Sequence, residues 1–257
     1  MSSSTKSNPR FAAYRTLPGT LRRAVQLSAL VPFMVAGFAT AQTSSPASPL
    51  QGKIQAMQQA AAENAKRLHD YQWIETDTVT LNGTPKPPRQ SLCHFTPDGK
   101  LSKTPIGSSQ DSPKLSRGPL KRKIEEKKIA EVKEELAEVG NVTSSYLPLN
   151  PNLLKQAIEV RRVELEHDGA RGVNSAVIHD YARPGDQVLL TMDGAMTRLQ
   201  QITVKTYLSS PADPLSLSVQ FSVLPDGTSY PSLTTQDAPA KRLSVTTVSA
   251  NFTRAVP

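Results

Sequence analysis

The 257-residue chain has little of the material from which most catalytic and metal sites are made: one cysteine, one tryptophan and four histidines. The lone Cys93 excludes an intramolecular disulfide framework and every zinc motif built on paired cysteines. The histidines show neither the His-x-x-x-His nor the His-Glu-x-x-His spacing, so no metal site is predicted. Gly-x-Ser-x-Gly elbows and glycine-rich phosphate loops are also missing. We therefore predict no catalytic residue and no cofactor, which argues against an enzyme without excluding one.

Cys93 and His94 are neighbours in a segment that has the composition of a strand. Successive side chains of a strand point to opposite faces, so these two cannot form a thiolate–imidazole pair. We predict that Cys93 is a buried small hydrophobe rather than a reactive thiol.

The positive charge is concentrated in an N-terminal segment. The first 41 residues contain no acidic residue and five of the 30 basic ones: Lys6, Arg10, Arg15, Arg22 and Arg23. An apolar run over 24–38 and the small residues Ala39-Thr40-Ala41 follow, which predicts a signal peptide over 1–41. The alternative is that this segment is retained as a membrane anchor. Export and cleavage place the rest of the chain in the periplasm or outside the cell. Without the leader, 25 basic and 22 acidic residues remain, a net charge of +3. That small excess, together with export, argues against a nucleic-acid partner.

Periodicity in the first half predicts helices interrupted by a few strands. After a Ser/Thr/Pro-rich spacer over 42–49, an amphipathic helix is expected over 50–69. Strands are expected over 71–81, 89–96 and 101–106, with turns at Asn82-Gly83 and at 97–99, and with Pro105 marking an edge strand. An exposed loop over 107–118 leads to a charged helix over 120–139 that ends at Gly140-Asn141. A short helix begins at Asn150-Pro151, and together these helices form an insertion over about 119–162.

From Val163 onward the period of the hydrophobic pattern changes to two. Short strands separated by turn residues, with no helix between them, predict an antiparallel sheet. The expected strands cover 163–166, 173–181, 188–192, 196–208, 215–224, 230–234 and 242–252. The fold class is therefore α+β, one domain over 50–257, with helices packed on one face of the sheet. Whether the sheet curves strongly into a half-barrel is left open.

One face of this sheet is apolar. In the clearest strand, Leu217, Val219 and Phe221 alternate with Ser216, Ser218 and Gln220. The residues expected on the apolar face, as candidates to line a ligand site, are Leu190, Met192, Ile202, Val204, Leu217, Val219 and Phe221. Such a face must be covered, since burying each large side chain contributes about 1.5–3 kcal/mol. Three helices are available as the cover, and ordinary core packing is the alternative role of these residues.

The order of elements resembles a known family. A leader, one amphipathic helix, a few strands, a helical insertion and then a run of antiparallel strands look like the periplasmic lipoprotein carriers of the LolA/LolB type. This resemblance covers most of residues 50–252 and rests on element order, because no residue motif of that family is matched. It implies an incomplete barrel that holds acyl chains under a helical lid. No functional residue is transferred from it.

The predicted charged helix has an unusual distribution of charge. Its N-terminal part is basic, with Lys121, Arg122, Lys123, Lys127 and Lys128, whereas acidic residues follow toward its C-terminal end. This order opposes the helix dipole, so helix stability alone does not account for it. One hypothesis is docking to an anionic surface such as phospholipid head groups. The alternative is a solvated charged face.

Two main function classes follow. The first is an exported, non-enzymatic envelope protein that carries a lipid or other apolar ligand in its sheet. The second is a structural or partner-binding envelope protein with a filled core and no ligand. An enzyme with an unrecognised site is a third class. The oligomeric state is not predicted.

Overall fold

The computed structural model describes residues 49–107, 119–169, 172–195 and 197–255. The signal peptide and the spacer predicted over 1–49 lie outside these residues except for Pro49, and so does nearly all of the loop expected over 107–118.

The described chain alternates between a small number of helices and many strands. Its first half contains α1 (Pro49–Leu68), β1 (Tyr71–Leu81), β2 (Thr84–Pro85), β3 (Arg89–Phe95), β4 (Leu101–Ile106), α2 (Pro119–Thr143) and α3 (Pro151–Glu159). Its second half contains β5 (Val163–Asp168), β6 (Val173–His179), β7 (Gln187–Asp193), β8 (Leu199–Tyr207), β9 (Pro214–Val223), β10 (Ser229–Ala238), the 3₁₀ helix η2 (Pro239–Lys241) and β11 (Leu243–Arg254). The predicted α+β class is confirmed.

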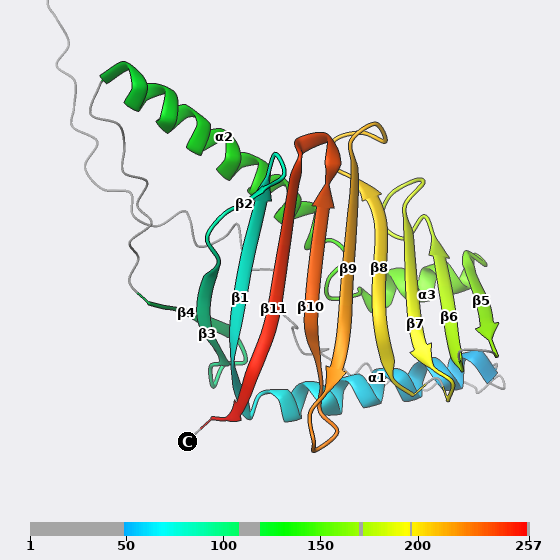
Figure 1. Ribbon diagram of the computed structural model, residues 1–257. Coiled ribbons are helices and arrows are strands. Elements are labelled where there is room, and N and C mark those ends of the chain that lie inside the picture. Colours follow the sequence, from blue (N-terminus) through cyan, green and yellow to red (C-terminus); the bar gives the residue numbers. More distant parts are fainter. Residues whose placement is uncertain (1–48, 108–118, 170–171, 196, 256–257) are drawn as a thin grey trace, which may run out of the picture.

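All the strands belong to one antiparallel sheet of 11 strands. Their order is β4-β3-β1-β11-β10-β9-β8-β7-β6-β5, and β2 pairs with β1 off this path. The last strand, β11, therefore joins the N-terminal strands to the C-terminal meander. The sheet is open, with β4 and β5 at its two edges, and it is not strongly curled (Figure 1). The half-barrel curvature that the sequence left open is not present.

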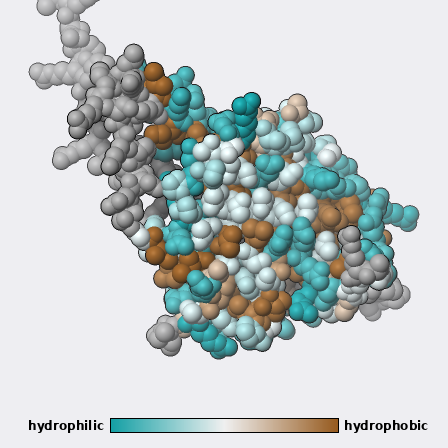
Figure 2. All heavy atoms as spheres, in the orientation of Figure 1, coloured by the Kyte–Doolittle hydropathy of each residue, from teal (hydrophilic) through white to brown (hydrophobic). Residues whose placement is uncertain are grey.

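The helices lie on one face of the sheet, which we call the covered face. In Figure 1, α1 crosses the ends of the strands, α3 lies behind β6–β8, and α2 extends beyond the edge of the sheet. The hydrophobic core lies between this face, the C-terminal end of α2 and α3. The opposite, open face is mostly polar, and Figure 2 shows pale and hydrophilic residues over much of it, with scattered hydrophobic ones.

Local sequence signals account for most of the boundaries. Asn82 and Gly83 both adopt positive φ, 52° and 75°, which is the conformation that a tight hairpin turn requires. Asn150 caps α3 by accepting a hydrogen bond from the Asn152 N–H at 2.9 Å. Pro105 lies in β4, an edge strand as predicted.

Several predicted ends differ from the structure: the strand expected over 173–181 ends at His179, and the strand expected over 196–208 begins at Leu199. Burial explains the two largest differences. Helix α2 does not stop at Gly140-Asn141 but continues to Thr143, because Val142 and Thr143 are buried against the sheet. Strand β10 continues past Thr234 to Ala238, where Gln236 and Ala238 are buried. Burial in the core therefore extends both elements beyond the residues at which the local sequence predicts them to end.

Candidate functional site

The residues predicted to line a ligand site lie together on the covered face. Leu190 and Met192 come from β7, Ile202 and Val204 from β8, and Leu217, Val219 and Phe221 from β9. Strand pairing places them in rows, Val188–Val204–Leu217 and Leu190–Ile202–Val219. All but Phe221 are at most 5% exposed, and Phe221 is partly buried against them. We call this surface the apolar strip.

The helical insertion covers the apolar strip. Val139, Val142 and Tyr146, at and just after the end of α2, and Ala157 of α3 belong to the same buried cluster as the strip. Leu153 and Leu154 of α3 are partly buried against it. Helix α3 has only nine residues, so one side of a short helix provides much of the cover.

A buried hydrogen-bond network attaches this cover to the sheet. The Tyr146 hydroxyl donates to Asp186 Oδ2 at 2.6 Å and lies 2.7 Å from the hydroxyl of Thr206 on β8. Asp186 also accepts from the backbone N–H groups of Tyr181, Ala182 and Arg183 at 2.5–2.9 Å. Burial and the Asp186 carboxylate raise the pKa of Tyr146 well above its usual value. We call the contacts among Tyr146, Asp186 and Thr206 the latch.

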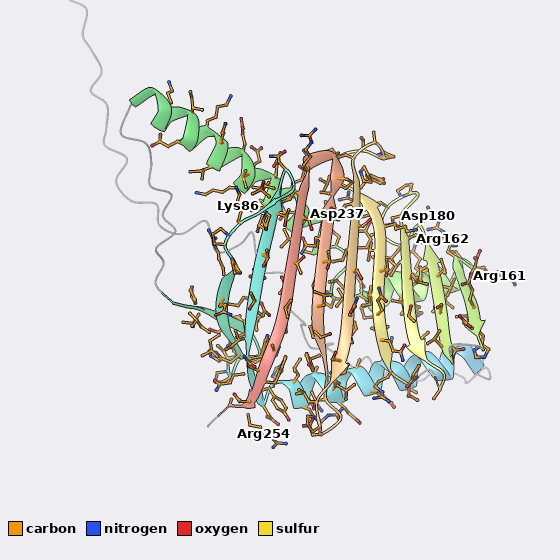
Figure 3. The ribbon with its side chains drawn as sticks, viewed as in Figure 1. Lys86, Arg161, Arg162, Asp180, Asp237 and Arg254 are labelled. Atoms are coloured by element: carbon orange, nitrogen blue, oxygen red, sulfur yellow. The ribbon has the colours of Figure 1, made fainter. Side chains whose placement is uncertain are left out.

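Two further contacts attach the insertion, one directly before α3 and one after it. The Tyr181 hydroxyl accepts a hydrogen bond from the Asn150 N–H at 2.6 Å, directly before α3. Burial raises the pKa of Tyr181 to about 12, so its hydroxyl stays protonated. After α3, the guanidinium of Arg162 donates to the Asp180 carbonyl at 3.1 Å, and Figure 3 shows both residues near the same ends of β5 and β6. The cover is therefore attached by polar contacts on both sides of α3.

The covered face changes character at β10, β11 and β1. Here the positions that continue the apolar rows are occupied by polar residues. We call these residues the polar patch: Glu75, Asp77, Gln236, Thr247 and Ser249. Glu75 is fully buried, forms an ion pair with Lys103 of β4 and accepts a hydrogen bond from Trp73 Nε1 at 3.1 Å. Asp77 accepts from the Thr247 hydroxyl at 2.5 Å. Burial raises the pKa of Asp77.

A small cavity lies beside the polar patch. It measures ≈ 10 Å³, about the room for one water molecule, and is lined by Glu75 and Ser249 together with Leu68, Trp73, Phe95, Tyr230, Pro231 and Phe252. Sequence reasoning missed this region. The sequence does contain a signal for it. Trp73, Glu75, Asp77 and Val79 are alternate residues and lie on one face of the strand, so that two acids stand between apolar residues.

Cys93 lies beside the polar patch, opposite Trp73 in the β1–β3 pair. It is fully buried, as predicted, and burial together with the nearby Glu75 raises the pKa of its thiol to about 12. A thiol in this state is a poor nucleophile, because the thiolate is the reactive form.

The predicted surface-docking residues lie on α2, where it extends beyond the sheet (Figure 1). Lys123, Lys127 and Lys128 are exposed, and Lys127 lies 3.7 Å from Glu131. The side chains of Lys121 and Arg122 are outside the part that the structure describes. Leu136 and Val139 of α2 pack on the core. The apolar stripe of α2 continues back through Val132 and Ile129, and one heptad earlier the equivalent positions are Glu125 and Arg122.

Within the described ranges, no three or more His, Cys, Asp or Glu side chains are grouped to hold a metal ion. None of the helices described is long and apolar enough to span a bilayer.

No protein-family model matches this chain. No curated protein matches it either. Among solved structures it is similar to a DUF1329 family protein from Desulfovibrio piger, with a TM-score of 0.39 and 9% identity over 81% of this chain and 94% of that one. It is also similar to a LolA superfamily protein from Nitrosomonas europaea, with a TM-score of 0.36 and 11% identity over 80% of this chain and 94% of that one. The second belongs to the group that the order of elements resembles. The likeness is distant and concerns the fold alone, and it assigns no ligand, activity or site residue to this chain.

Proposed function

We propose that the chain is an exported, non-enzymatic envelope protein that carries a lipid-like ligand on the apolar strip, beneath the helical insertion. One observation supports this most directly: a wide apolar surface is covered largely by the nine-residue α3 and the end of α2, which polar contacts attach on both sides of α3. The ligand enters when these contacts open and α3 moves away from β7–β9.

An acyl chain can replace the cover that it displaces. Moving α3 uncovers Ala157, Leu153 and Leu154, together with the part of the strip beneath them. Each methylene of a ligand that takes their place contributes about 0.8 kcal/mol, so roughly eight buried methylenes contribute about 6 kcal/mol. This is comparable with the burial of two or three large side chains at about 1.5–3 kcal/mol each. The free energy gained by burying the ligand is therefore close to the free energy lost when α3 moves away from the strip.

The proposal is tested on purified protein from which residues 1–41 have been removed. Mass spectrometry of its organic extract is expected to show a stoichiometric lipid, and the delipidated protein is expected to bind a hydrophobic fluorescent probe. In Val204→Thr, a hydroxyl replaces a methyl group within the strip, and probe binding should weaken. Thr203→Val on the open face of the same strand is the matched control and should leave it unchanged. A clean extract together with no probe binding would refute the carrier.

A second function is favoured by a different observation. Six of the predicted lining residues are at most 5% exposed and belong to one continuous buried cluster, as in a filled core. On this proposal the protein is a structural or partner-binding component of the envelope, and the apolar strip only stabilises the fold. The clean extract that refutes the carrier is the result that this second function predicts.

We also propose that the exposed basic half of α2 docks the protein on an anionic phospholipid surface. Lys123, Lys127 and Lys128 are exposed on the half of α2 that extends beyond the sheet, where cationic side chains favour an anionic surface. Replacing these three lysines by Gln should reduce binding to vesicles that contain anionic lipid, and added salt should reduce wild-type binding. Replacing Lys66, Arg67 and Lys86 by Gln removes the same charge elsewhere and is the control. Equal, salt-insensitive binding of all three proteins would overturn the docking proposal.

A further inference from the structure

The open face of the sheet, opposite the helices, contains a group of apolar side chains. Val248 of β11 pairs with Leu233 of β10, and Ile74 of β1 pairs with Ala250 of β11 and with Leu92 of β3. Directly paired residues project to the same face, and the residues that alternate with them along β1 and β11 are buried on the covered face. Val248 is 42% exposed, Ala250 is exposed, and the other three are partly exposed. We call these five residues the open-face patch, and Figure 2 shows hydrophobic residues over this part of the sheet.

Formation of the strands does not require apolar residues at these positions. Threonine occupies other positions of the same face of β1 and β11, including Thr76, Thr78 and Thr246. Threonine is β-branched and is enriched in strands, as valine and isoleucine are, and its hydroxyl remains hydrated. Apolar residues that gather on an otherwise polar face are expected where another surface packs against them.

The surface around the open-face patch is almost free of charge. Among the described residues, Asp237 is the only Asp, Glu, Lys or Arg that strand alternation places on the open face of β4, β3, β1, β11, β10 and β9. It lies near the end of β10, away from the patch (Figure 3). Gln90 and Gln220 are among the neighbours of the patch, whereas the open face of β5 and β8 contains Glu164 and Lys205. An apolar centre with an uncharged polar surround is typical of a protein–protein interface.

The charge and the area of this surface fit a second copy of the same chain. In a dimer with two-fold symmetry the patch meets its own copy, so a patch with charge of one sign would repel itself and an uncharged patch does not. The six strands have 6–12 residues each. At about 4.8 Å between strands and about 3.3 Å per residue they cover roughly 900 Å². A stable interface buries about 800 Å² of each partner, so this part of the open face is large enough.

We infer that two copies of the chain pack open face against open face through the open-face patch. The two sheets then form a sandwich about 10 Å thick, in which Ile74, Leu233 and Val248 of one copy contact the patch of the other. The covered faces, with α2 and α3, point outward from this dimer. The apolar strip and its cover are therefore left unchanged, and this inference does not depend on the carrier function.

The experiment measures the mass of the purified protein, without residues 1–41, by analytical ultracentrifugation over a range of concentrations. The wild type is expected to be a dimer that dissociates on dilution. Val248→Lys introduces like charges on both sides of the symmetric interface, which should raise the dissociation constant of the dimer at least about tenfold. Val248→Thr keeps a β-branched side chain and should weaken the dimer less, and it decides the question if the lysine variant does not fold. Circular dichroism checks the fold of each variant.

Val223→Lys is the matched control. Val223 has the same exposed fraction of 42% and also lies in a strand, but alternation along β9 places it on the covered face. This variant should leave the dimer unchanged. A wild type that is monomeric at every concentration, or a dimer that Val248→Lys and Val223→Lys weaken equally, would overturn the inference. Co-purification of a different protein that Val248→Lys releases would assign the patch to that partner and would overturn the second copy as its occupant.

Discussion

The apolar strip and the polar patch are two parts of one sheet face, built from strands with the same alternation, yet they are stabilised differently. The strip, on β7–β9, packs against α3 and the end of α2. In the patch, on β10, β11 and β1, Glu75 forms an ion pair with Lys103 of β4 and accepts a hydrogen bond from Trp73 of its own strand, and Asp77 accepts one from Thr247 of the neighbouring β11. Strand periodicity therefore determines which face a residue occupies, but the chemistry of that face depends on what lies against it.

The largest effect that would sharpen this contrast comes from the buried ion pair of the polar patch. Lys103→Met leaves the fully buried Glu75 without its cation, which should reduce the free energy of unfolding by about 3–5 kcal/mol. The double variant Glu75→Gln/Lys103→Met should lose less than the sum of the two single changes. Urea unfolding at neutral pH measures all three.

The control for Lys103 is a second lysine of the same hairpin. Lys100 is 2.7 Å from Asp98 in an exposed pair, and Lys100→Met should leave the free energy of unfolding nearly unchanged. If Lys103→Met cost no more than Lys100→Met, the polar patch would not depend on its buried charges, and the contrast with the strip would fail.

In the apolar strip, stability should depend on packing volume instead of charge. Leu217 is 1% exposed, and Leu217→Ala should cost about 2–5 kcal/mol in urea unfolding, as for other large core residues. Its neighbour Ser218 points to the open face, so Ser218→Ala should change stability by no more than about 0.5 kcal/mol. Similar losses in the two variants would show that the strip is not the core.

The sequence predicts the apolar strip far better than the polar patch, for a physical reason. Leu217 and Val219 alternate with serines, and this alternation is enough to assign a face. The alternation of β1 places Glu75 and Asp77 on the same face as Trp73 and Val79, but it does not indicate that the two acids are buried. Their burial depends on partners distant in sequence, such as Lys103 on β4 and Thr247 on β11, which no local pattern reveals.

The same limit applies to the cover over the strip. Asn150-Pro151 predicts the start of α3 from a local cap, whereas the latch joins Tyr146 to Asp186 and Thr206, 40 and 60 residues away. The extension of α2 to Thr143 is also invisible locally, since only the packing of Val142 on the sheet overrides the signal at Gly140-Asn141.

Loosening the latch tests whether the cover of the strip is separable from the sheet. Tyr146→Phe removes the hydroxyl between Asp186 and Thr206 and should cost about 1–3 kcal/mol of stability. A hydrophobic probe should then bind faster in stopped-flow mixing. The control is Tyr207→Phe, whose hydroxyl donates to the Pro184 carbonyl at 3.3 Å near the surface. Equal binding rates in these two variants would mean that the latch does not limit access to the strip.

The smallest effect concerns Asp77, the acid of the polar patch that accepts a hydrogen bond from Thr247. Burial raises the pKa of Asp77 above the ordinary value of 3.8, so between these two pH values the folded state binds more protons than the unfolded state. The contribution of Asp77 to stability therefore falls as pH rises through that window, and the cost of ionising it in the fold is fully present above the raised pKa. Asp77→Asn can still accept from Thr247 and removes that cost, so urea unfolding at several pH values should show a flatter profile above pH 3.8 and slightly higher stability at pH 7. Asp237→Asn, on the open face, controls for loss of an acid and should leave this part of the profile unchanged. A steeper profile in Asp77→Asn than in the wild type would mean that the carboxylate stabilises the patch.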